Sequence, residues 1–458
     1  MHGDFSRLTF RPDKRFSAVL AQQGRVQLDA EANEQVLINQ HRQRTAIGDV
    51  IGRFGGPRGA NGFKLTYLPK DKAPASLVIG GGRYYVDGIL VEATRPPRGV
   101  PVLDDPETDP APAPPAEWTY WDQPDAHRDQ ERPDEAHHLP AEFPFLAYLL
   151  VTEHLVTAIQ DPEIRETALG PALPDTSART KVSWQVLPLT AKDGLQIPDR
   201  PTPENLMAAF DGWVERGRAT GRLAARAERP SRTEDDPCLS APDARFRGLE
   251  NQLYRVEIHA GGKQPTFKWS RENGSVALPV STVDKTWVTL AEGARDLKLG
   301  LSIGDWVELA DDASVARGEI GPLAQIRDID TEALRIELST ESATGVGRPG
   351  RHAFLRRWDQ RGDARPVEEG KWLDLEDGVQ VWFAAGGKYR GGDYWLIPAR
   401  TLSGEVEWPR NERGEPLLRP QLGIVRHYAP LAWIPAAGQL TDLRLTFGPI
   451  AQHVVSEL

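Results

Sequence analysis

The alternation of apolar and polar residues predicts a helix near the start of the chain. From Asp29 to Ile51 the sequence has no Pro, and its first Gly is Gly48. Asp29 can cap this helix, and Glu31 suits the positive end of its dipole. Its apolar side consists of five residues: Val36, Leu37, Ile47, Val50 and Ile51. So thin a stripe is typical of a helix that rests on a neighbouring surface, not of one in a bundle core.

A second helix is predicted over residues 203–216. Pro203 suits its first turn. Four apolar residues share one face: Leu206, Phe210, Trp213 and Val214. We expect this helix to pack on a sheet.

Elsewhere apolar residues recur at every second position, which is typical of strands. Residues 84–86 and 89–91 flank Asp87-Gly88, a dipeptide that favours a tight hairpin turn. In residues 254–259, apolar side chains alternate with Arg255, Glu257 and His259. Four short strand candidates then follow, over residues 287–290, 306–310, 324–329 and 334–338. Their close spacing suits a small barrel or sandwich.

These elements predict a mainly β, multidomain protein made of β-sandwich and small barrel modules, with an N-terminal helix and one further amphipathic helix. A chain of 458 residues is longer than one ordinary hydrophobic core can organise. We divide it into five parts: 1–94, the N-terminal helix plus a small β module; 95–144, an acidic Pro-rich linker or excursion; 145–282, a β-rich middle domain with helix 203–216; 283–345, a small barrel-like module; and 346–458, a C-terminal β region.

Negative charge is concentrated in residues 95–144. This segment holds 12 Asp or Glu against 4 Arg, so it carries −8 of the chain's net charge of −11. It also holds 12 Pro, which oppose ladder pairing, although Trp118, Tyr120 and Trp121 indicate that part of it docks on a surface. The remaining sequence is nearly neutral and lacks the basic footprint of a nucleic-acid binder, so we expect no nucleic-acid partner.

Cysteine usage and hydropathy exclude further classes. The only cysteine is Cys238, which excludes a disulfide framework or a cysteine-based metal site within one chain. No run of about 18 apolar residues occurs, so we expect no direct membrane insertion. The first residues lack the basic and apolar regions of a signal peptide, which favours assembly in the cytoplasm.

Two glycine motifs match functional patterns in their letters but not in their surroundings. Residues 300–304 have the spacing of a nucleophile elbow around Ser302, but residues 305–309 predict a strand where an elbow needs a helix. Residues 345–350 match the dinucleotide fingerprint without a βαβ unit around them. We therefore expect a turn before a barrel strand and a glycine-rich loop, and we predict no enzyme, no catalytic residue and no cofactor.

Two further clusters each have two interpretations. Asp305, Glu308, Asp311 and Asp312 could offer oxygens to calcium, but alternation along a strand separates the first two, so we expect a solvated barrel edge and no metal site. Six aromatic residues also crowd one region: Trp372, Trp382, Tyr389, Tyr394, Trp395 and Trp408. They form a carbohydrate platform or partner surface, or else they fill glycine-rich β cores.

Three separated stretches carry a resemblance to one family. The first is QQGRVQLDAEANE at 22–34, which leads into the N-terminal helix. The second lies within 156–186 and continues through LENQLYRVEIH at 249–259 and FKWSRENG at 267–274. The third is GDYWLIPART at 392–401, with EWP at 407–409 after it. Together they are similar to an uncharacterised domain family encoded with bacterial contractile injection systems, which are phage-tail-like particles.

This resemblance carries no catalytic residues. It implies a structural subunit at the baseplate or its periphery, present in several copies and bound to baseplate, sheath or tube proteins of a particle that is released or membrane-associated. We expect contacts through Gln40, Gln43 and Arg44 of the N-terminal helix and through Trp395 and Trp408. The alternative is a carbohydrate-binding or surface-attachment module that uses the C-terminal aromatic cluster.

Overall fold

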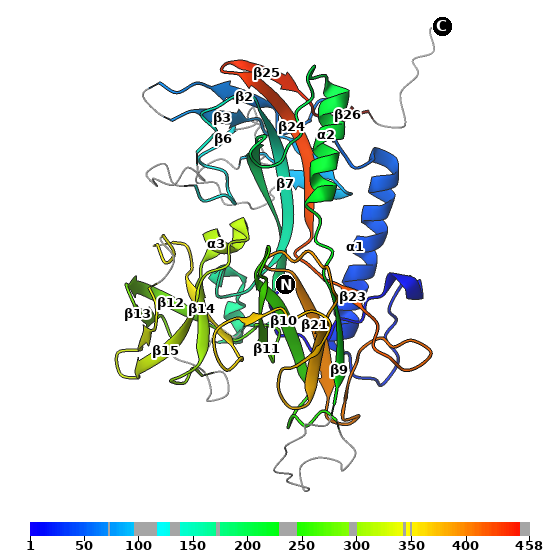
Figure 1. Cartoon of the computed structure of the whole chain (residues 1–458), viewed down its shortest axis with the longest axis vertical. Coiled ribbons are helices and arrows are strands. Elements are labelled where there is room, and N and C mark those ends of the chain that lie inside the picture. The colour runs from blue at the N-terminus through cyan, green and yellow to red at the C-terminus, as the bar shows by residue number, and fades with distance from the viewer. Residues whose placement is uncertain are drawn as a thin grey trace. The chain divides into compact units, whose positions relative to one another are not determined.

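A computed structural model of the chain describes residues 1–71, 74–95, 117–128, 138–170, 175–228, 245–292, 300–341, 345–348 and 350–448. These residues confirm the predicted class, because they form several sheets, including a closed barrel, and three α-helices. The helices are α1 (Asp29–Ile51), α2 (Pro203–Arg216) and α3 (Asp312–Arg317) (Figure 1). No helix in the described ranges is long and apolar enough to cross a membrane.

The helices α1 and α2 have the bounds that their local signals predict. At the start of α2, the backbone N–H of Asn205 donates to the side chain of Thr202, and the backbone N–H of Thr202 donates to the side chain of Asn205. This reciprocal cap fixes the first turn. Phe210 then packs with Leu146 of strand β7 (Phe145–Val156), so the predicted packing of this helix on a sheet is confirmed.

The third helix, α3, is too short for a hydrophobic period to reveal it. The backbone N–H of Ser314 donates to the Asp311 carboxylate at 2.9 Å, and the backbone N–H of Asp311 donates to Ser314 Oγ at 2.9 Å. Gly318 ends the helix in the left-handed conformation, with φ of 65°. Asp311 therefore stabilises the start of a helix next to the barrel strand that precedes it.

Contacts divide the chain into two compact units, and the division falls within α1. Unit 1 comprises Met1–Val36, Glu153–Lys181 and Arg218–Val425, and unit 2 comprises Leu37–Thr152, Val182–Gly217 and Arg426–Leu458. Strands β7 and β8 (Arg179–Leu189) also continue from one unit into the other. The five parts predicted from the sequence stay a prediction.

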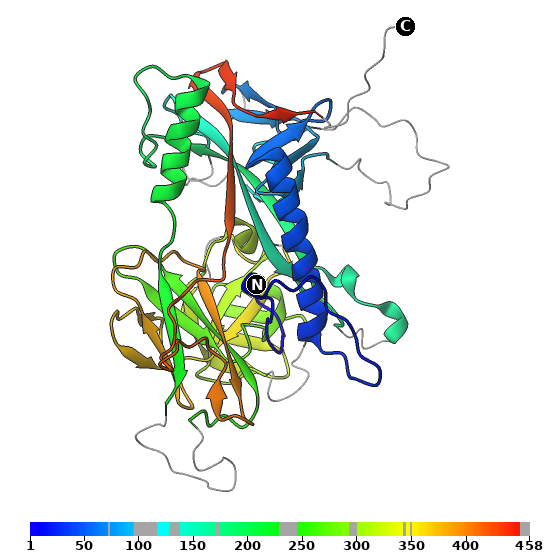
Figure 2. The same ribbon diagram turned by 90° about the vertical axis from the view of Figure 1, so that its right-hand side faces the viewer.

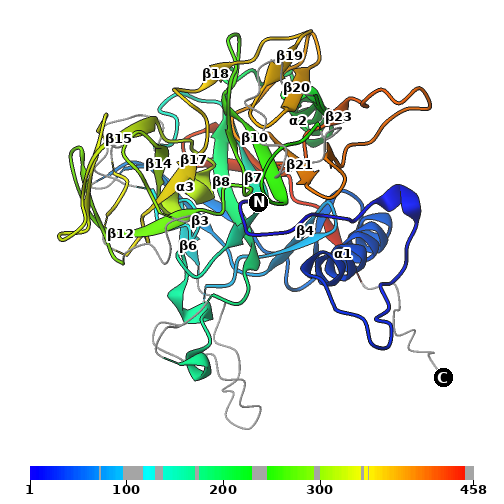
Figure 3. The ribbon, with the colours of Figure 1, turned by 90° about the horizontal axis from the view of Figure 1, so that it is seen from below.

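Unit 1 contains a β-sandwich, whose two sheets share one apolar core. The first sheet has the order β18 (Arg365–Pro366), β11 (Thr266–Ser270), β10 (Gln252–Ala260), β21 (Tyr394–Arg400), β22 (Glu405–Val406). The second has the order β19 (Trp372–Asp374), β20 (Val379–Phe383), β9 (Arg222–Ala227), β23 (Arg419–Pro420). Figure 3 shows β18, β19 and β20 together with β10 and β21.

Unit 1 also contains a closed barrel of six antiparallel strands, yellow-green in Figure 1. Its strands, in order around the barrel, are β12 (Ala277–Asp284), β13 (Trp287–Leu290), β16 (Arg335–Leu338), β15 (Leu323–Asp330), β14 (Trp306–Ala310) and β17 (Phe354–Trp358). Alternate side chains, including Val288, Val307 and Ile336, fill the interior. The barrel thus extends beyond the predicted module 283–345 at both ends.

The described residues of unit 2 form three sheets. The first has the order β26 (Thr446–Phe447), β1 (Phe54–Pro57), β4 (Arg83–Val86), β5 (Ile89–Glu92), and the second has β2 (Leu65–Leu68), β3 (Ser76–Ile79), β6 (Trp118–Thr119). The third has the order β25 (Gln439–Asp442), β24 (Arg426–Ala436), β7, β8. In the first sheet Val86 pairs with Ile89, which confirms the hairpin predicted around Asp87-Gly88.

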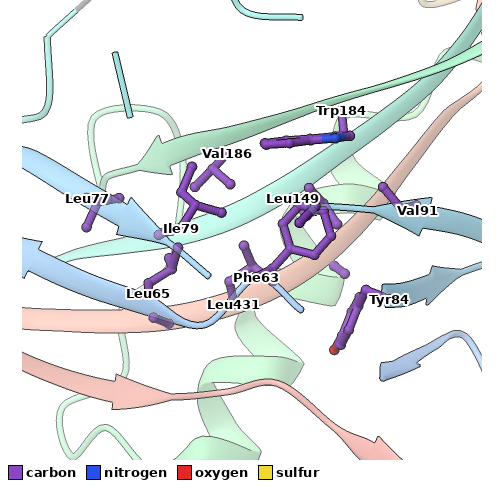
Figure 4. Packing of buried hydrophobic residues seen from close by; sticks show 14 of the residues in the cluster. Phe63, Leu65, Leu77, Ile79, Tyr84, Val91, Leu149, Trp184, Val186 and Leu431 are labelled. Carbon is purple, nitrogen blue, oxygen red and sulfur yellow. The ribbon is translucent and has the colours of Figure 1, made fainter. Parts of the chain in front are cut away.

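Side chains from all three sheets of unit 2 meet in one core (Figure 4). At its centre Phe63 and Trp184 lie edge to face, with 5.0 Å between ring centroids. Tyr120 and Trp121 are buried in the same cluster, and Trp118 packs against it. The predicted docking of these aromatic residues is therefore confirmed. The rest of the predicted acidic linker, residues 96–116 and 129–137, lies outside the described residues.

Candidate functional site

A cluster of buried charged side chains lies on one face of strand β10 in unit 1. Alternation along β10 directs Tyr254, Val256 and Ile258 into the sandwich core. Arg255 and Glu257 point to the opposite face, where solvent would be expected. That face is buried as well. A second layer, which includes barrel residues, therefore covers this side of the sheet.

Lys268 joins this face of the sheet to the barrel. It stands directly opposite Glu257 in the pairing of β10 with β11, and its exposed fraction is 0%. Its Nζ lies 3.4 Å from Glu257 Oε1 and 2.5 Å from Glu308 Oε2 on barrel strand β14. Trp358 Nε1 also donates to Glu308 Oε2, at 3.1 Å. We call Arg255, Glu257, Lys268 and Glu308 the buried charged cluster.

The first three residues of the chain complete this cluster. Arg255 donates to the Met1 carbonyl oxygen at 3.1 Å, and Asn273 Nδ2 donates to the Gly3 carbonyl oxygen at 2.9 Å. His2 Nε2 lies 2.9 Å from Glu257 Oε2. Backbone and side-chain groups of the segment thus supply further hydrogen-bond partners to Arg255, Glu257 and Asn273. The cluster is consequently an anchor for the N-terminal segment.

Neighbouring charges decide the ionisation of this anchor. Burial alone would raise the pKa of Glu257, but Arg255 and Lys268 hold that pKa well below its ordinary value. Burial, together with the guanidinium of Arg255, lowers the pKa of His2 well below 6.5. At neutral pH a neutral imidazole therefore faces an ionised carboxylate, and His2 donates its Nε2–H to Glu257. Because its charges are matched within the cluster, the arrangement is suited to holding the segment in place.

The two sets of predicted interaction residues fall in different units. On α1, Gln43 is exposed, and Gln40 and Arg44 are half-buried. Trp395 has an exposed fraction of 1%, and its Nε1 donates to the Arg419 carbonyl oxygen at 3.0 Å. Its prediction as a surface residue is wrong, because it points into the sandwich core.

Trp408 is half-buried and packs against the same core. Its Nε1 donates to the Leu417 carbonyl oxygen at 2.8 Å. Tyr389 and Tyr394 are buried as well. Of the six crowded aromatic residues, only Trp372 and Trp382 lie on the outer face of the second sandwich sheet, half-buried and opposite each other. The interpretation of the others as core filling is therefore the better one.

The acidic residues near the barrel are not a solvated edge. Glu308 belongs to the buried charged cluster, and Asp311 is buried as the cap of α3. Asp305 accepts a hydrogen bond from the backbone N–H of Ser302 at 2.8 Å. That bond closes the turn before β14, which confirms the turn predicted for residues 300–304. No group of three metal-ligating side chains occurs among the residues described here.

The glycine-rich stretch at 345–350 is described at 345–348 and at Gly350, where it forms turns. The backbone N–H of Gly347 donates to Asp311 Oδ2 at 3.2 Å. Strand β17 follows, as expected for a loop between barrel strands. This stretch therefore helps to hold the cap of α3.

The residues of β10 alone do not predict the buried charged cluster. The alternation of Arg255 and Glu257 with apolar residues is the pattern of a half-exposed strand. A cue lies in the neighbouring strand, where Lys268 stands between Phe267 and Trp269. A lysine in such an aromatic setting needs a carboxylate partner when it is buried.

The fold and the anchor define a mainly β, multidomain protein whose N-terminal segment is tied to a sandwich and barrel unit. A family model matches residues 1–102 and 214–454. The chain belongs to that family, which is described as a family of unknown function (DUF6519). No curated protein and no solved structure matches the chain.

Proposed function

We propose that this protein is a structural subunit of a bacterial contractile injection particle, at or near the baseplate, and that it acts by protein–protein assembly. The three sequence stretches that resemble the family encoded with such particles support the choice of particle. The surface of the N-terminal segment, residues 1–36, supports assembly. In this proposal the subunit joins the particle in the cytoplasm in several copies.

The observation that carries the proposal is the outward placement of apolar side chains in the N-terminal segment. Phe16, Leu20 and Val26 have exposed fractions of 60%, 83% and 82%. Four more large apolar residues of the segment are also exposed: Met1, Leu8, Leu28 and Val36. Single exposed apolar residues are normal, but seven within one segment are typical of an interaction surface.

Polar contacts hold the same segment in place. Ser6 Oγ donates to Asp29 Oδ1 at 2.6 Å, and the backbone N–H of Val19 donates to Gln35 Oε1 at 2.6 Å. Figure 2 shows the segment (dark blue) passing beside the first turns of α1. The backbone is thus positioned while the apolar side chains remain available.

Covering these side chains with a partner surface would favour association. Burying one Val, Leu or Phe side chain contributes about 1.5–3 kcal/mol. Phe16, Leu20 and Val26 together could therefore contribute roughly 5 kcal/mol or more before the costs of association. An interface of this kind combines an apolar centre with a polar rim. Gln40, Gln43 and Arg44 of α1 are the proposed polar contacts.

The test is incorporation into particles. The triple variant Phe16→Ser/Leu20→Ser/Val26→Ser should keep the wild-type melting temperature but be missing from particles purified from cells that carry the whole gene cluster. The matched control is Leu249→Ser/Ile303→Ser/Leu402→Ser, since these residues are also strongly exposed. Equal loss of both variants, or normal incorporation of the first, would contradict the proposal. Absence of sheath, tube and baseplate genes beside this one would also contradict it.

A further inference from the structure

The outer face of the second sandwich sheet carries two parallel rows of side chains across strands β19, β20 and β9. In the first row Trp372 pairs with Trp382, and Trp382 pairs with Ala224. In the second row Asp374 pairs with Gln380, and Gln380 pairs with Arg226. Alternation places both rows on the face away from the core residues Leu373, Val381 and Ala225. We call Trp372, Trp382, Asp374, Gln380 and Arg226 the tryptophan face.

The polar row of this face is held in one orientation. Arg226 Nε donates to Gln380 Oε1 at 2.8 Å, and Gln380 Nε2 donates to Asp374 Oδ1 at 2.7 Å. The row therefore has a guanidinium with further donors at one end and a carboxylate with a second acceptor oxygen at the other. Donors and acceptors of fixed direction stand beside the aromatic row.

The aromatic row is open to solvent in part. Trp372 and Trp382 are half-buried, with 5.6 Å between ring centroids and 59° between ring planes, so neither ring covers the other by parallel stacking. The guanidinium of Arg226 lies 4.2 Å from the Trp372 ring centroid and fixes that ring. Within the described residues, neither indole N–H has a hydrogen-bond partner. By contrast, Trp395 and Trp408 donate to backbone carbonyls.

We propose that the tryptophan face binds a neutral pyranose unit of a glycan chain. The apolar C–H face of a pyranose ring packs on an indole, and its hydroxyl groups need donors and acceptors at the rim of that contact. Trp382 supplies the stacking surface. Asp374 accepts from hydroxyl groups, while Arg226 and the free indole N–H groups donate to them. The 5.6 Å between the two ring centroids is comparable with the length of one hexose unit.

Other classes of ligand fit this face less well. An apolar protein surface would bury the Asp374 carboxylate and the Gln380 amide without new partners, which is unfavourable. An anionic ligand would meet Asp374 and also Glu228, whose carboxylate lies 3.8 Å from Arg226. A cation would have to replace Arg226 on the Trp372 ring. A neutral polyhydroxyl ligand satisfies both rows at once. This site is independent of the proposed assembly through the N-terminal segment.

The experiment is retention of the full chain on immobilised neutral hexose and N-acetylhexosamine oligosaccharides, followed by calorimetric titration with the retained oligosaccharides. Trp382→Ala and Trp372→Ala should each weaken binding at least tenfold. Gln380→Ala, which breaks the polar row and leaves both indoles, should weaken binding by a smaller factor. The matched control is Trp287→Ala, because Trp287 is also half-buried and lies 4.7 Å from an arginine guanidinium, that of Arg335. Binding by this control should be unchanged.

Three results would overturn the proposal. The first is that no neutral oligosaccharide is retained above the level of the double variant Trp372→Ala/Trp382→Ala. The second is retention that the double variant keeps. The third is retention of acidic glycans alone.

Folding of each variant is checked by its melting temperature. Trp382→Phe, which keeps a smaller ring, should bind with intermediate strength. The incorporation of Trp382→Ala into particles should be normal, which separates this proposal from the assembly proposal.

Discussion

Lys268 of β11 and Glu308 of β14 form an ion pair, with 2.5 Å between Nζ and Oε2, that connects a sandwich sheet to the barrel in unit 1. Their side-chain exposed fractions are 0% and 7%. A pair so deeply buried stabilises a structure mainly by matching charges that are already desolvated. Removing one partner therefore has a larger effect than replacing both.

Lys268→Met should lower the free energy of unfolding of the protein by about 3–5 kcal/mol, because Glu308 would remain buried without its cation. The double variant Lys268→Met/Glu308→Met should recover part of this loss. Urea unfolding of the three proteins measures both effects. The control is Lys192→Met, since Lys192 and Glu142 form a pair whose side chains are 79% and 77% exposed, and it should change little. A double variant less stable than the single one would contradict the interpretation.

The anchoring of the N-terminal segment should weaken as the pH falls below about 6.5. The pKa of His2 is lowered in the folded chain, so below 6.5 the unfolded chain binds a proton that the folded chain does not. Stability from this group is present above 6.5 and is lost as the pH falls through the lowered pKa. The pKa of Glu257, lowered from 4.5, acts in the same direction at more acid pH.

Amide hydrogen exchange of residues 2–9 at about pH 7.5 and about pH 5.5, corrected for the intrinsic rates, measures this effect. The groups around the imidazole are Glu257, Arg255, Arg356 and the ring of Trp358. His2→Gln keeps a donor without the titration, so its exchange protection should vary less with pH in this range. Equal pH dependence in the variant would show that another group is responsible.

Gly88→Ala should destabilise unit 2 by about 2–4 kcal/mol. Gly88 has φ of +78°, and an added Cβ would lie 2.2 Å from the backbone oxygen of Arg44 in α1. The hairpin turn and the helix backbone approach so closely that no side chain fits between them. The control is Gly59→Ala, where φ is +86° but no atom lies within 4 Å, so it should cost only about 1 kcal/mol. Melting temperatures compare the two, and equal shifts would argue against the contact.

Trp184→Ala should lower the free energy of unfolding of the protein by about 3–5 kcal/mol. Trp184 lies edge to face with Phe63 in the core, and its Nε1 donates to the Glu92 carbonyl oxygen at 3.1 Å. Trp184→Phe keeps the aromatic contact and loses the hydrogen bond, so it should cost less. Denaturant titration ranks the variants. If the Phe variant lost as much as the Ala variant, the hydrogen bond would outweigh the packing.

Local signals in the sequence determined the bounds of α1 and α2 and the approximate positions of four of the six barrel strands: β13, β14, β15 and β16. Caps, prolines, turn dipeptides and hydrophobic periods act within a few residues of each other, so they can be recognised without the fold. The barrel strand β14 occupies the residues predicted for it, 306–310. The short helix α3 was not predicted, because six residues are too few to display a helical period.

Only the tertiary structure decided which faces are covered. The alternation of residues along β10 predicts that Arg255 and Glu257 share a face. It does not predict that residues from the N-terminus and the barrel cover that face. The same limit applies to the aromatic residues: Trp395 points into the sandwich core, whereas Trp382 lies on an outer face. The physical reason is that burial of a strand's second face depends on elements far away in the chain. Their packing leaves no trace in the local alternation of residues.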